Sequence, residues 1–365
     1  MKQTIDHAIV LIPSLEPDRR LPVYIKELQE YGLSRIVIVD DGSGNDYQDI
    51  YKELEECGCT VIHHSINRGK GFALKTGYDY IRENISGYTC IVTADSDGQH
   101  APEDVYKLAV ETKGHPDAMI LGVRDFKKAG IPAKSLIGNR VTSAIFAALY
   151  GKCLPDTQSG LRAFGPKLAE RMLDIKGERF EYETQVLITC IRSKIPILTL
   201  PIQTIYEDEN RGTHFKAVRD SLKIIGILGA DFMKFLSSSV ACSFVDIGIT
   251  WALLDWMKPY MKGEDFLRIM IATAFARSVS TAGNYLLNKS MVFKDKQAPG
   301  HSLIRYLSLC VFNILLSAAG VYILHVSLGY NEKTAKLLCD GCLFLLGYQI
   351  QQRWVFSREE GWFRE

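Results

Sequence analysis

The sequence predicts an α/β domain built on a mostly parallel sheet, followed by an all-α membrane domain of four helices. The first part rests on short apolar runs that alternate with amphipathic stretches over residues 1–230. The second rests on four long apolar segments that fill most of residues 231–357. We therefore expect two domains with these bounds and a short tail at 358–365.

Five short apolar runs predict the strands of the sheet. Two stretches between them, residues 20–32 and 70–84, repeat apolar residues at helical spacing and predict helices. In a sheet of this kind helices cover both faces, and ligands bind beyond the carboxyl ends of the strands. The five runs are HAIVLIP, RIVIVDDGS, CTVIHH, CIVTADSDGQ and AMILGVRD.

Polar residues follow three of these strands: PSLE at 13–16, DDGS at 40–43 and the ADSDGQ segment at 94–99. Because parallel strands end at one edge of a sheet, we expect the three segments to meet in one crevice. The DDGS segment also suits a plain turn, since Asp, Gly and Ser are turn formers. A dinucleotide motif is excluded there because Tyr47 stands in place of the third glycine.

Asp95 and Asp97 deliver two negative charges to one strand end, where like charges repel. No arginine is adjacent to them in the sequence, so a divalent cation is the best way to reconcile the pair. Oxygen ligands suit Mg²⁺ or Mn²⁺, and these ions usually also hold substrate phosphates. The NRGKG stretch at 67–71 is either a plain turn or a phosphate site, in which Lys70 and backbone N–H groups at a helix start would bind the anion.

Composition argues against nucleic-acid binding and leaves a cysteine-based metal or redox site as an alternative. The formal net charge is +1, which provides no strongly basic face for nucleic acid. Nine cysteines include a C-x-C at 57–59 and a C-x-x-C at 339–342. A metal or redox site at either pair is an alternative, but no second pair completes a ligand set, and reduced thiols are the preferred interpretation.

Six motifs follow one another over about residues 5–230: VDDGSGND, NRGKGFALKTG, ADSDGQH, GVRDF, DTQSGLRAF and FEYET. In this order they resemble glycosyltransferase family 2, and within it the polyprenyl-phosphate sugar transferases of the dolichol-phosphate mannose synthase type. The resemblance implies a Rossmann-like, GT-A type fold, a nucleotide-sugar donor, and an undecaprenyl or dolichyl phosphate acceptor. Residues 13–17 read PSLEP where the family often has P-x-Y-N-E, so the base of the donor, guanine or uracil, stays open.

The resemblance also implies roles for individual residues. Asp95, Asp97 and Gln99 would bind Mn²⁺ or Mg²⁺, and Arg124 would grip phosphate on the acceptor side. The donor-binding residues would be Pro13, Leu15, Glu16, Asp40, Asp41, Lys70, Asp95 and Ser96. The catalytic and acceptor-side residues would be Asp97, Arg124, Lys134, Arg140, Asp156, Arg162, Glu183 (or Glu181) and Arg211.

The chemistry of the implied reaction limits what the protein must supply. A lipid phosphate is ionised near neutral pH, so this nucleophile needs no general base. Catalysis then reduces to positioning and charge stabilisation. We therefore expect direct, inverting transfer of a hexose, from a donor of the GDP-mannose or UDP-glucose type, without a covalent intermediate on the enzyme.

The second half predicts four membrane spans. The third is uncharged from Tyr306 to Leu324, long enough to cross a bilayer at ~20 residues. Asp246, Arg277 and Asp340 interrupt the other three, where they either pair to hold the helices together or line a polar path. The predicted spans are 235–254, 267–287, 306–328 and 337–355.

The second and fourth spans end alike, as GNYLLNKSMVF at 283–293 and GYQIQQRWVF at 347–356, which predicts two helix pairs built alike. The layout over 230–357 resembles the GtrA-like family of four-span proteins. Basic residues gather before the first span and between the second and third. The positive-inside rule then puts both termini and the catalytic domain in the cytoplasm, on a multi-pass protein of the plasma membrane.

Two further functions need to be weighed: one is compatible with lipid glycosylation and the other competes with it. The membrane domain could act as a flippase for the lipid-linked sugar, as conjectured for the GtrA-like family. A processive polysaccharide synthase would need a cytosolic Q-x-x-R-W, but Ile350 occupies the required glutamine position and the segment ends a span, so we reject this alternative. A homo-oligomer is left open.

Overall fold

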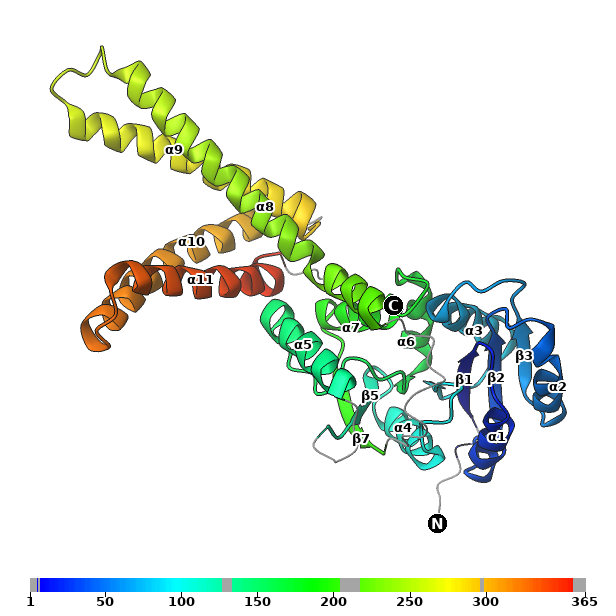
Figure 1. Ribbon diagram of the computed structural model, residues 1–365. Coiled ribbons are helices and arrows are strands. Elements are labelled where there is room, and N and C mark those ends of the chain that lie inside the picture. The colour runs from blue at the N-terminus through cyan, green and yellow to red at the C-terminus, as the bar shows by residue number, and fades with distance from the viewer. Residues whose placement is uncertain (1–4, 6, 127–132, 204–216, 296–298, 357–365) are drawn as a thin grey trace. The chain divides into compact units, whose positions relative to one another are not determined.

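The computed structural model describes residues 5, 7–126, 133–203, 217–295 and 299–356 (Figure 1). The chain divides into two compact units, Met1–Ile227 and Leu228–Glu365, each treated by itself below.

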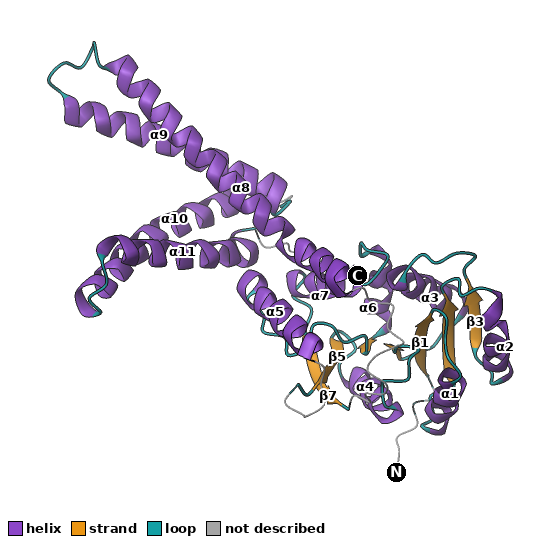
Figure 2. Cartoon of the chain, viewed as in Figure 1, coloured by secondary structure: helices purple, strands orange, loops and turns teal. Residues whose placement is uncertain are grey.

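The first unit contains, within its described residues, a seven-stranded sheet of order β3-β2-β1-β4-β6-β5-β7 (Figure 2). The antiparallel partner is β6, which pairs with β4 and β5, and the other pairings are parallel. All five predicted strands are confirmed, and β6 and β7 are additions. The strands are β1 (Ala8–Ser14), β2 (Arg35–Asp40), β3 (Thr60–His63), β4 (Cys90–Thr93), β5 (Met119–Arg124), β6 (Arg162–Phe164) and β7 (Ile197–Ile202).

Helices cover both faces of this sheet. Alternate residues of each strand point to opposite faces, and the side chains of Val10, Ile38 and Val92 belong to one buried core with residues of α1, α2 and α4. On the other face α3 packs so closely on β1 that a Cβ at Gly77 would lie 2.2 Å from Leu11 Cδ1. The helices are α1 (Arg20–Glu30), α2 (Gln48–Glu56), α3 (Lys70–Asn84), α4 (Pro102–Gly114), α5 (Ala133–Tyr150), α6 (Pro166–Arg171) and α7 (Glu181–Arg192).

The strand order brings distant segments to one edge of the sheet. Because β1, β2 and β4 are parallel, Ser14, Asp40 and Thr93 end at the same edge. The antiparallel β6 begins there, since Arg162 pairs with Thr93. The segment before β6 therefore reaches the same edge as the three predicted strand ends.

The second unit is helical, and its helices fall on the four predicted spans. They are α8 (Ala217–Met257, which begins in the first unit), α9 (Asp265–Leu287), α10 (Pro299–Tyr322) and α11 (Glu332–Ile350), with π-helical turns η4 (Asn288–Val292), η5 (Ile323–Ser327) and η6 (Gln351–Val355). Two stretches of the described chain, Lys223–Met257 and Gly300–Ser327, are long and apolar enough to cross a membrane.

The two helix pairs are joined by a repeated aromatic arrangement. The ring centroids of Tyr285 and Phe356 lie 5.7 Å apart, with the rings inclined at 35°. Tyr348 follows Tyr285 by 63 positions and Phe293 precedes Phe356 by 63, and these two rings lie at the same distance and angle. Phe293 stacks on Phe356 at 5.1 Å. The duplication expected from the sequence is thus present in three dimensions.

Polar side chains also join or stabilise these helix pairs. The buried Asn288 donates from Nδ2 to Gln351 Oε1 at 3.1 Å, and each of the two begins a π-helical turn. The charges that interrupt the spans are paired as well. Arg277 lies 3.2 Å from Asp246, and Asp340 accepts from Ser317 Oγ at 2.7 Å. Asp340 also pairs with Lys336 at 3.1 Å.

Candidate active site

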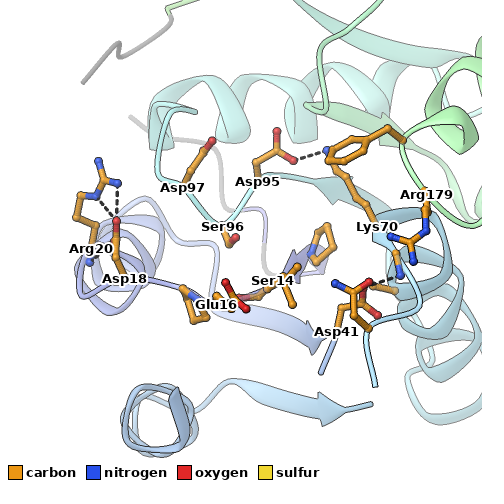
Figure 3. A pocket seen from close by; sticks show the side chains of 17 residues that line it. Ser14, Glu16, Asp18, Arg20, Asp41, Lys70, Asp95, Ser96, Asp97 and Arg179 are labelled. Carbon is orange, nitrogen blue, oxygen red and sulfur yellow. Dashed lines mark hydrogen bonds and ion pairs between the residues drawn. The ribbon is translucent and has the colours of Figure 1, made fainter. Parts of the chain in front are cut away.

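A cavity of about 390 Å³ opens at the carboxyl ends of β1, β2 and β4, inside the first unit (Figure 3). Two cationic side chains that the sequence analysis did not select, Arg20 and Arg179, also line it. The guanidinium of Arg20 is bound by Asp18, with Nε 2.8 Å from Oδ2. The predicted residues among those that line the cavity are Pro13, Leu15, Glu16, Asp41, Lys70, Asp95, Ser96 and Asp97.

Lys70 and Asp95 form an ion pair in the wall of this cavity. Lys70 Nζ lies 2.6 Å from Asp95 Oδ1 and 3.0 Å from Glu183 Oε1. Burial alone would lower the pKa of Lys70, but the two carboxylates outweigh it and hold that pKa above its usual value. Burial would likewise raise the pKa of Asp95, but Lys70 and His100 hold it well below its usual range. Both groups are therefore charged at neutral pH.

This pair corrects part of the argument made from the sequence. We expected a metal ion to be needed because no cation is adjacent to the two carboxylates in the chain. In the folded unit Lys70 arrives from α3 and His100 Nε2 lies 3.3 Å from Asp95 Oδ2. The repulsion between the carboxylates is thus already relieved on the side of Asp95.

Asp97 differs from Asp95 in its surroundings. Its Oδ1 accepts from the backbone N–H of Gln99 at 3.0 Å, and no described residue donates to its other oxygen. Burial, together with the charge of Asp95, raises the pKa of Asp97. A carboxylate that lines a cavity and is short of positive charge suits a bound cation.

The described residues include no group of three or more His, Cys, Asp or Glu side chains placed to hold a metal. Of the predicted set, Asp95 and Asp97 line the cavity, whereas Gln99 is not among its described lining residues. Mg²⁺ is commonly held by one or two carboxylates together with substrate phosphates and water. The two aspartates fit that kind of site and do not form a complete cage.

Asp40 and Asp41 hold the loops that shape the cavity. Asp41 accepts from the backbone N–H groups of Arg68 at 3.0 Å and of Gly69 at 2.6 Å, and thereby fixes the start of α3. Asp40 is buried, is not among the described lining residues, and accepts from Ser43 N at 2.8 Å. Asp41 is thus the one of the two aspartates that reaches the cavity wall.

Gly160 forms the floor beneath the Lys70–Asp95 pair. A Cβ built on Gly160 would lie 2.7 Å from Asp95 Oδ2 and 2.9 Å from Lys70 Nζ. Its carbonyl accepts from Thr93 Oγ1 at 2.8 Å, which ties the segment to β4. Only a residue without a side chain leaves this pair undisturbed.

Arg124 and Asp156 form an ion pair. Arg124 Nε lies 2.7 Å from Asp156 Oδ2, and Nη2 lies 3.0 Å from Oδ1, in a bidentate pair with a fully buried carboxylate. Arg162 donates from Nη1 to the carbonyl of Glu183 at 2.7 Å. The role of Arg124 in binding the acceptor phosphate stays a prediction.

Of the remaining predicted cations, the structure describes the side chain of one, Arg140. Arg140 is exposed on α5 and is not among the described lining residues. Arg211 and the side chain of Lys134 lie outside the described part of the chain. Glu181 pairs with Lys223 at 2.8 Å, whereas Glu183 pairs with Lys70, which lines the cavity. The signal for Arg179 was its place directly before FEYET.

The fold and the site indicate a class of protein: an α/β enzyme whose cavity at the strand ends is lined by both carboxylates and cationic side chains. Apolar helices follow this domain in the chain. Comparison with known proteins identifies it further. Residues 11–172 match glycosyl transferase family 2, and residues 234–356 match the GtrA/DPMS transmembrane domain. The chain belongs to glycosyl transferase family 2 and carries a transmembrane domain of the GtrA/DPMS kind. It is therefore a glycosyltransferase of the membrane.

Several relatives support the assignment. An uncharacterized protein of Methanocaldococcus jannaschii is 32% identical over 57% of this chain and 86% of its own. The UDP-N-acetylglucosamine–dolichyl-phosphate N-acetylglucosaminyltransferase of Methanococcus voltae is also 32% identical, over 56% of this chain and 89% of its own. The polyprenol monophosphomannose synthase of Mycolicibacterium smegmatis is 25% identical over 48% and 69%.

Among solved structures, glucosyl-3-phosphoglycerate synthase of Mycobacterium tuberculosis, crystallised with Mn²⁺ and UDP, is 16% identical to this chain. The match covers 61% of this chain and 78% of that one, with a TM-score of 0.48. A similarity of this size carries no inference about ligands.

Proposed function

We propose that this chain transfers a hexose from a nucleotide-diphosphate sugar to a polyprenyl phosphate at the cytoplasmic face of the plasma membrane. The observation that carries the proposal is the strand-end cavity, where Asp95 and Asp97 lie with Lys70 and Arg179. Acids next to cations suit a diphosphate that arrives with a metal ion. The acceptor class is taken from relatives whose names specify dolichyl phosphate or polyprenol.

Asp97 and Asp95 would hold Mn²⁺ or Mg²⁺, and the ion would neutralise negative charge on the departing nucleoside diphosphate. Lys70 and Arg179 would bind the same diphosphate, because both line the cavity and carry positive charge. Asp41, with Asp40 beside it, and Glu16 would contact the nucleoside. Arg124 would bind phosphate on the acceptor side, as the family resemblance implies, and Arg162 would hold the backbone of Glu183 in place.

The acceptor phosphate, already ionised, would attack the sugar directly and invert its anomeric configuration. No base is required, so the protein contributes orientation and charge. Arg140, Lys134 and Arg211 would serve the acceptor side, as the family resemblance implies. In this proposal residues 1–230 form the catalytic domain, residues 231–357 form a four-span membrane domain, and residues 358–365 form a cytoplasmic tail.

A lipid-extraction assay tests the proposal. Membranes that contain the full chain are incubated with labelled UDP-glucose, GDP-mannose or UDP-N-acetylglucosamine and with undecaprenyl or dolichyl phosphate. We expect one donor to label the lipid fraction, with an inverted anomer in the product. No labelling from any donor, or a product with retained configuration, would contradict the proposal. A topology reporter beside Lys262 should read extracytoplasmic, and a cytoplasmic signal would contradict the orientation.

A second function, movement of the lipid-linked sugar across the bilayer, has one observation in its favour. A groove of about 590 Å³ on α10 and α11 is lined by Ser317, Lys336 and Asp340 among apolar side chains. Polar groups of this kind in a span usually face a protein interior or a polar path. Liposomes that carry an inactive Asp97→Ala chain should then move preformed labelled lipid. Movement no faster than in empty liposomes would exclude this function.

A further inference from the structure

Lys70 is shared between two carboxylates that differ in their access to the cavity. Its Nζ lies 2.6 Å from Asp95 Oδ1 and 3.0 Å from Glu183 Oε1. Lys70 and Asp95 line the cavity, whereas Glu183 is not among its described lining residues. The ammonium therefore joins a carboxylate that lines the cavity, Asp95 (Figure 3), to one that is not among the described lining residues, Glu183.

Glu183 is the fixed member of this group. It lies in the first turn of α7, and its carbonyl accepts from the buried guanidinium of Arg162 at 2.7 Å. Its side chain is largely buried, with Lys70 as its partner. Lys70 is the first residue of α3, at a helix start fixed by Asp41 through the backbone N–H of Gly69.

Lys70 binds Oδ1 of Asp95, and His100 Nε2 lies 3.3 Å from Oδ2, so both oxygens already have a partner. A divalent ion that binds Asp95 together with Asp97 therefore competes with the ammonium for Asp95. The floor of the site prevents retreat in one direction, because Gly160 already lies against both groups. The ammonium can instead turn into the cavity and keep its ion pair with Glu183, so that its charge stays compensated.

We infer that, in the enzyme without bound donor, Lys70 pairs with Asp95 in place of the divalent metal. Lys70 and the metal therefore compete for this carboxylate. When a nucleoside diphosphate arrives, Lys70 leaves Asp95 for the diphosphate and stays paired with Glu183. The metal is then bound tightly only together with the donor. This inference rests on the proposed function, since it presupposes a metal-dependent nucleotide-sugar donor.

Mn²⁺ binding to the full chain in detergent micelles tests the inference without reference to turnover. Free Mn²⁺ is followed by electron paramagnetic resonance, with and without UDP or GDP. In Lys70→Met, Asp95 and Glu183 face the metal with no cation between them, so we expect Mn²⁺ alone to bind about tenfold more tightly than in the wild type. In Glu183→Gln, Lys70 keeps a single partner, Asp95, and we expect Mn²⁺ alone to bind several-fold more weakly.

The opposite signs of these two changes separate competition from a merely structural role, which would weaken Mn²⁺ binding in both variants. Lys75→Met is the matched control on the same helix, because Lys75 lies over the Tyr182 ring at 5.2 Å and is not among the described lining residues. Lys70→Gln repeats the test if the methionine variant does not fold.

The result that overturns the inference is Mn²⁺ binding in Lys70→Met, or in Lys70→Gln if that variant is used, as weak as in the wild type or weaker. If the wild type also binds Mn²⁺ tightly with UDP or GDP, only the inference fails and the proposed function stands. If the wild type binds no Mn²⁺ with either nucleotide, the metal role in the proposed function fails as well.

Discussion

The two units of this chain bury polar groups in different ways. In the first unit, the ion pair of Lys70 with Asp95 lies in the wall of a cavity, and Arg124 pairs with the fully buried Asp156. The second unit also pairs charges, as in Lys289 with Asp295, but a buried polar contact between its helix pairs is neutral, between Asn288 and Gln351. Most of the large apolar side chains that are exposed also belong to the second unit.

The difference follows from the surroundings that each unit is built for. A charge pair next to a water-filled cavity keeps part of its solvation and remains available to an ionic ligand. At the junction of the two helix pairs, a neutral amide pair joins the helices without the cost of burying a charge. We therefore expect changes at the cavity to alter activity far more than stability, and changes at the amide junction to do the reverse.

The largest effect is expected from Asp97→Asn. The amide keeps the shape of the side chain but not its charge, so the cation on the leaving group would be lost. We expect sugar transfer to fall on the order of 10³-fold, with the unfolding temperature unchanged or higher, because the ionised carboxylate is disfavoured where it lies. Transfer rates measured by lipid extraction, beside circular dichroism melts, check both parts.

Asp79→Asn is the matched control for this change, because Asp79 is an exposed carboxylate that pairs with Arg82 on the surface of α3. Full activity of Asp97→Asn, or of the wild type in EDTA, would contradict the proposed metal site.

A smaller loss is expected from Gly160→Ala. The added Cβ would meet Asp95 Oδ2 at 2.7 Å and Lys70 Nζ at 2.9 Å, and these side-chain ends can shift at little cost in stability. Their displacement from the donor should lower the transfer rate about 10²-fold. Gly114→Ala, which meets no atom within 4 Å, should leave the rate unchanged. If Gly160→Ala instead lowers the unfolding temperature and leaves the transfer rate of the folded protein unchanged, Gly160 serves stability rather than activity. That result would weaken the comparison between the two units.

Much of the fold was predictable because burial imposes a period on the sequence. The five predicted strands and the helix at 70–84 follow from such periods, and so do the four long helices. Strand β6 was missed because three residues are too few to show any pattern. Strand β7 was missed because it contains Pro201, which disfavours a strand assignment.

The site was predictable where it depends on strand ends, and not where it depends on pairs between distant elements. Asp95, Asp97 and Glu16 line the cavity because parallel strands end at one edge. The partnership of Lys70 with Asp95 joins α3 to the loop after β4, and that of Arg124 with Asp156 joins residues 32 positions apart. Such pairs leave no local pattern, so the sequence could not predict that Lys70 and Arg124 would have these carboxylate partners.

The amide junction of the second unit should respond in the opposite way to the cavity. Asn288→Ala removes the donor to Gln351 Oε1 and the acceptor for Ser238 Oγ, at 3.1 and 2.7 Å. We expect a loss of about 1–2 kcal/mol in unfolding free energy in micelles, with the transfer rate within twofold of the wild type. The measurement is a double-mutant cycle with Gln351→Ala, whose coupling should be about 1 kcal/mol.

The control for this cycle is Ser290→Ala, because Ser290 is exposed and bonds only to the Leu286 carbonyl of its own helix in the described structure. Additive losses, with no coupling between Asn288 and Gln351, would show that the amide pair does not join the repeats.

The smallest effect concerns Asp40, a buried charge of the first unit that is not among the described residues lining the cavity. Burial raises its pKa, but hydrogen bonds from Ser43 and His63 outweigh this and hold the pKa below the usual value. A carboxyl whose pKa is depressed by folding stabilises the folded state above its unfolded pKa of about 3.9, and that stabilisation is lost as the pH falls through the folded value. The wild type should therefore lose unfolding free energy more steeply than Asp40→Asn below about pH 4.

The exposed Asp46→Asn should follow the wild type, and equal slopes for all three proteins would mean that the ionised form of Asp40 does not stabilise the folded state. Because the amide junction of the second unit has no group that titrates in this range, an acid-dependent loss confined to the catalytic unit would sharpen the contrast between charged and neutral burial.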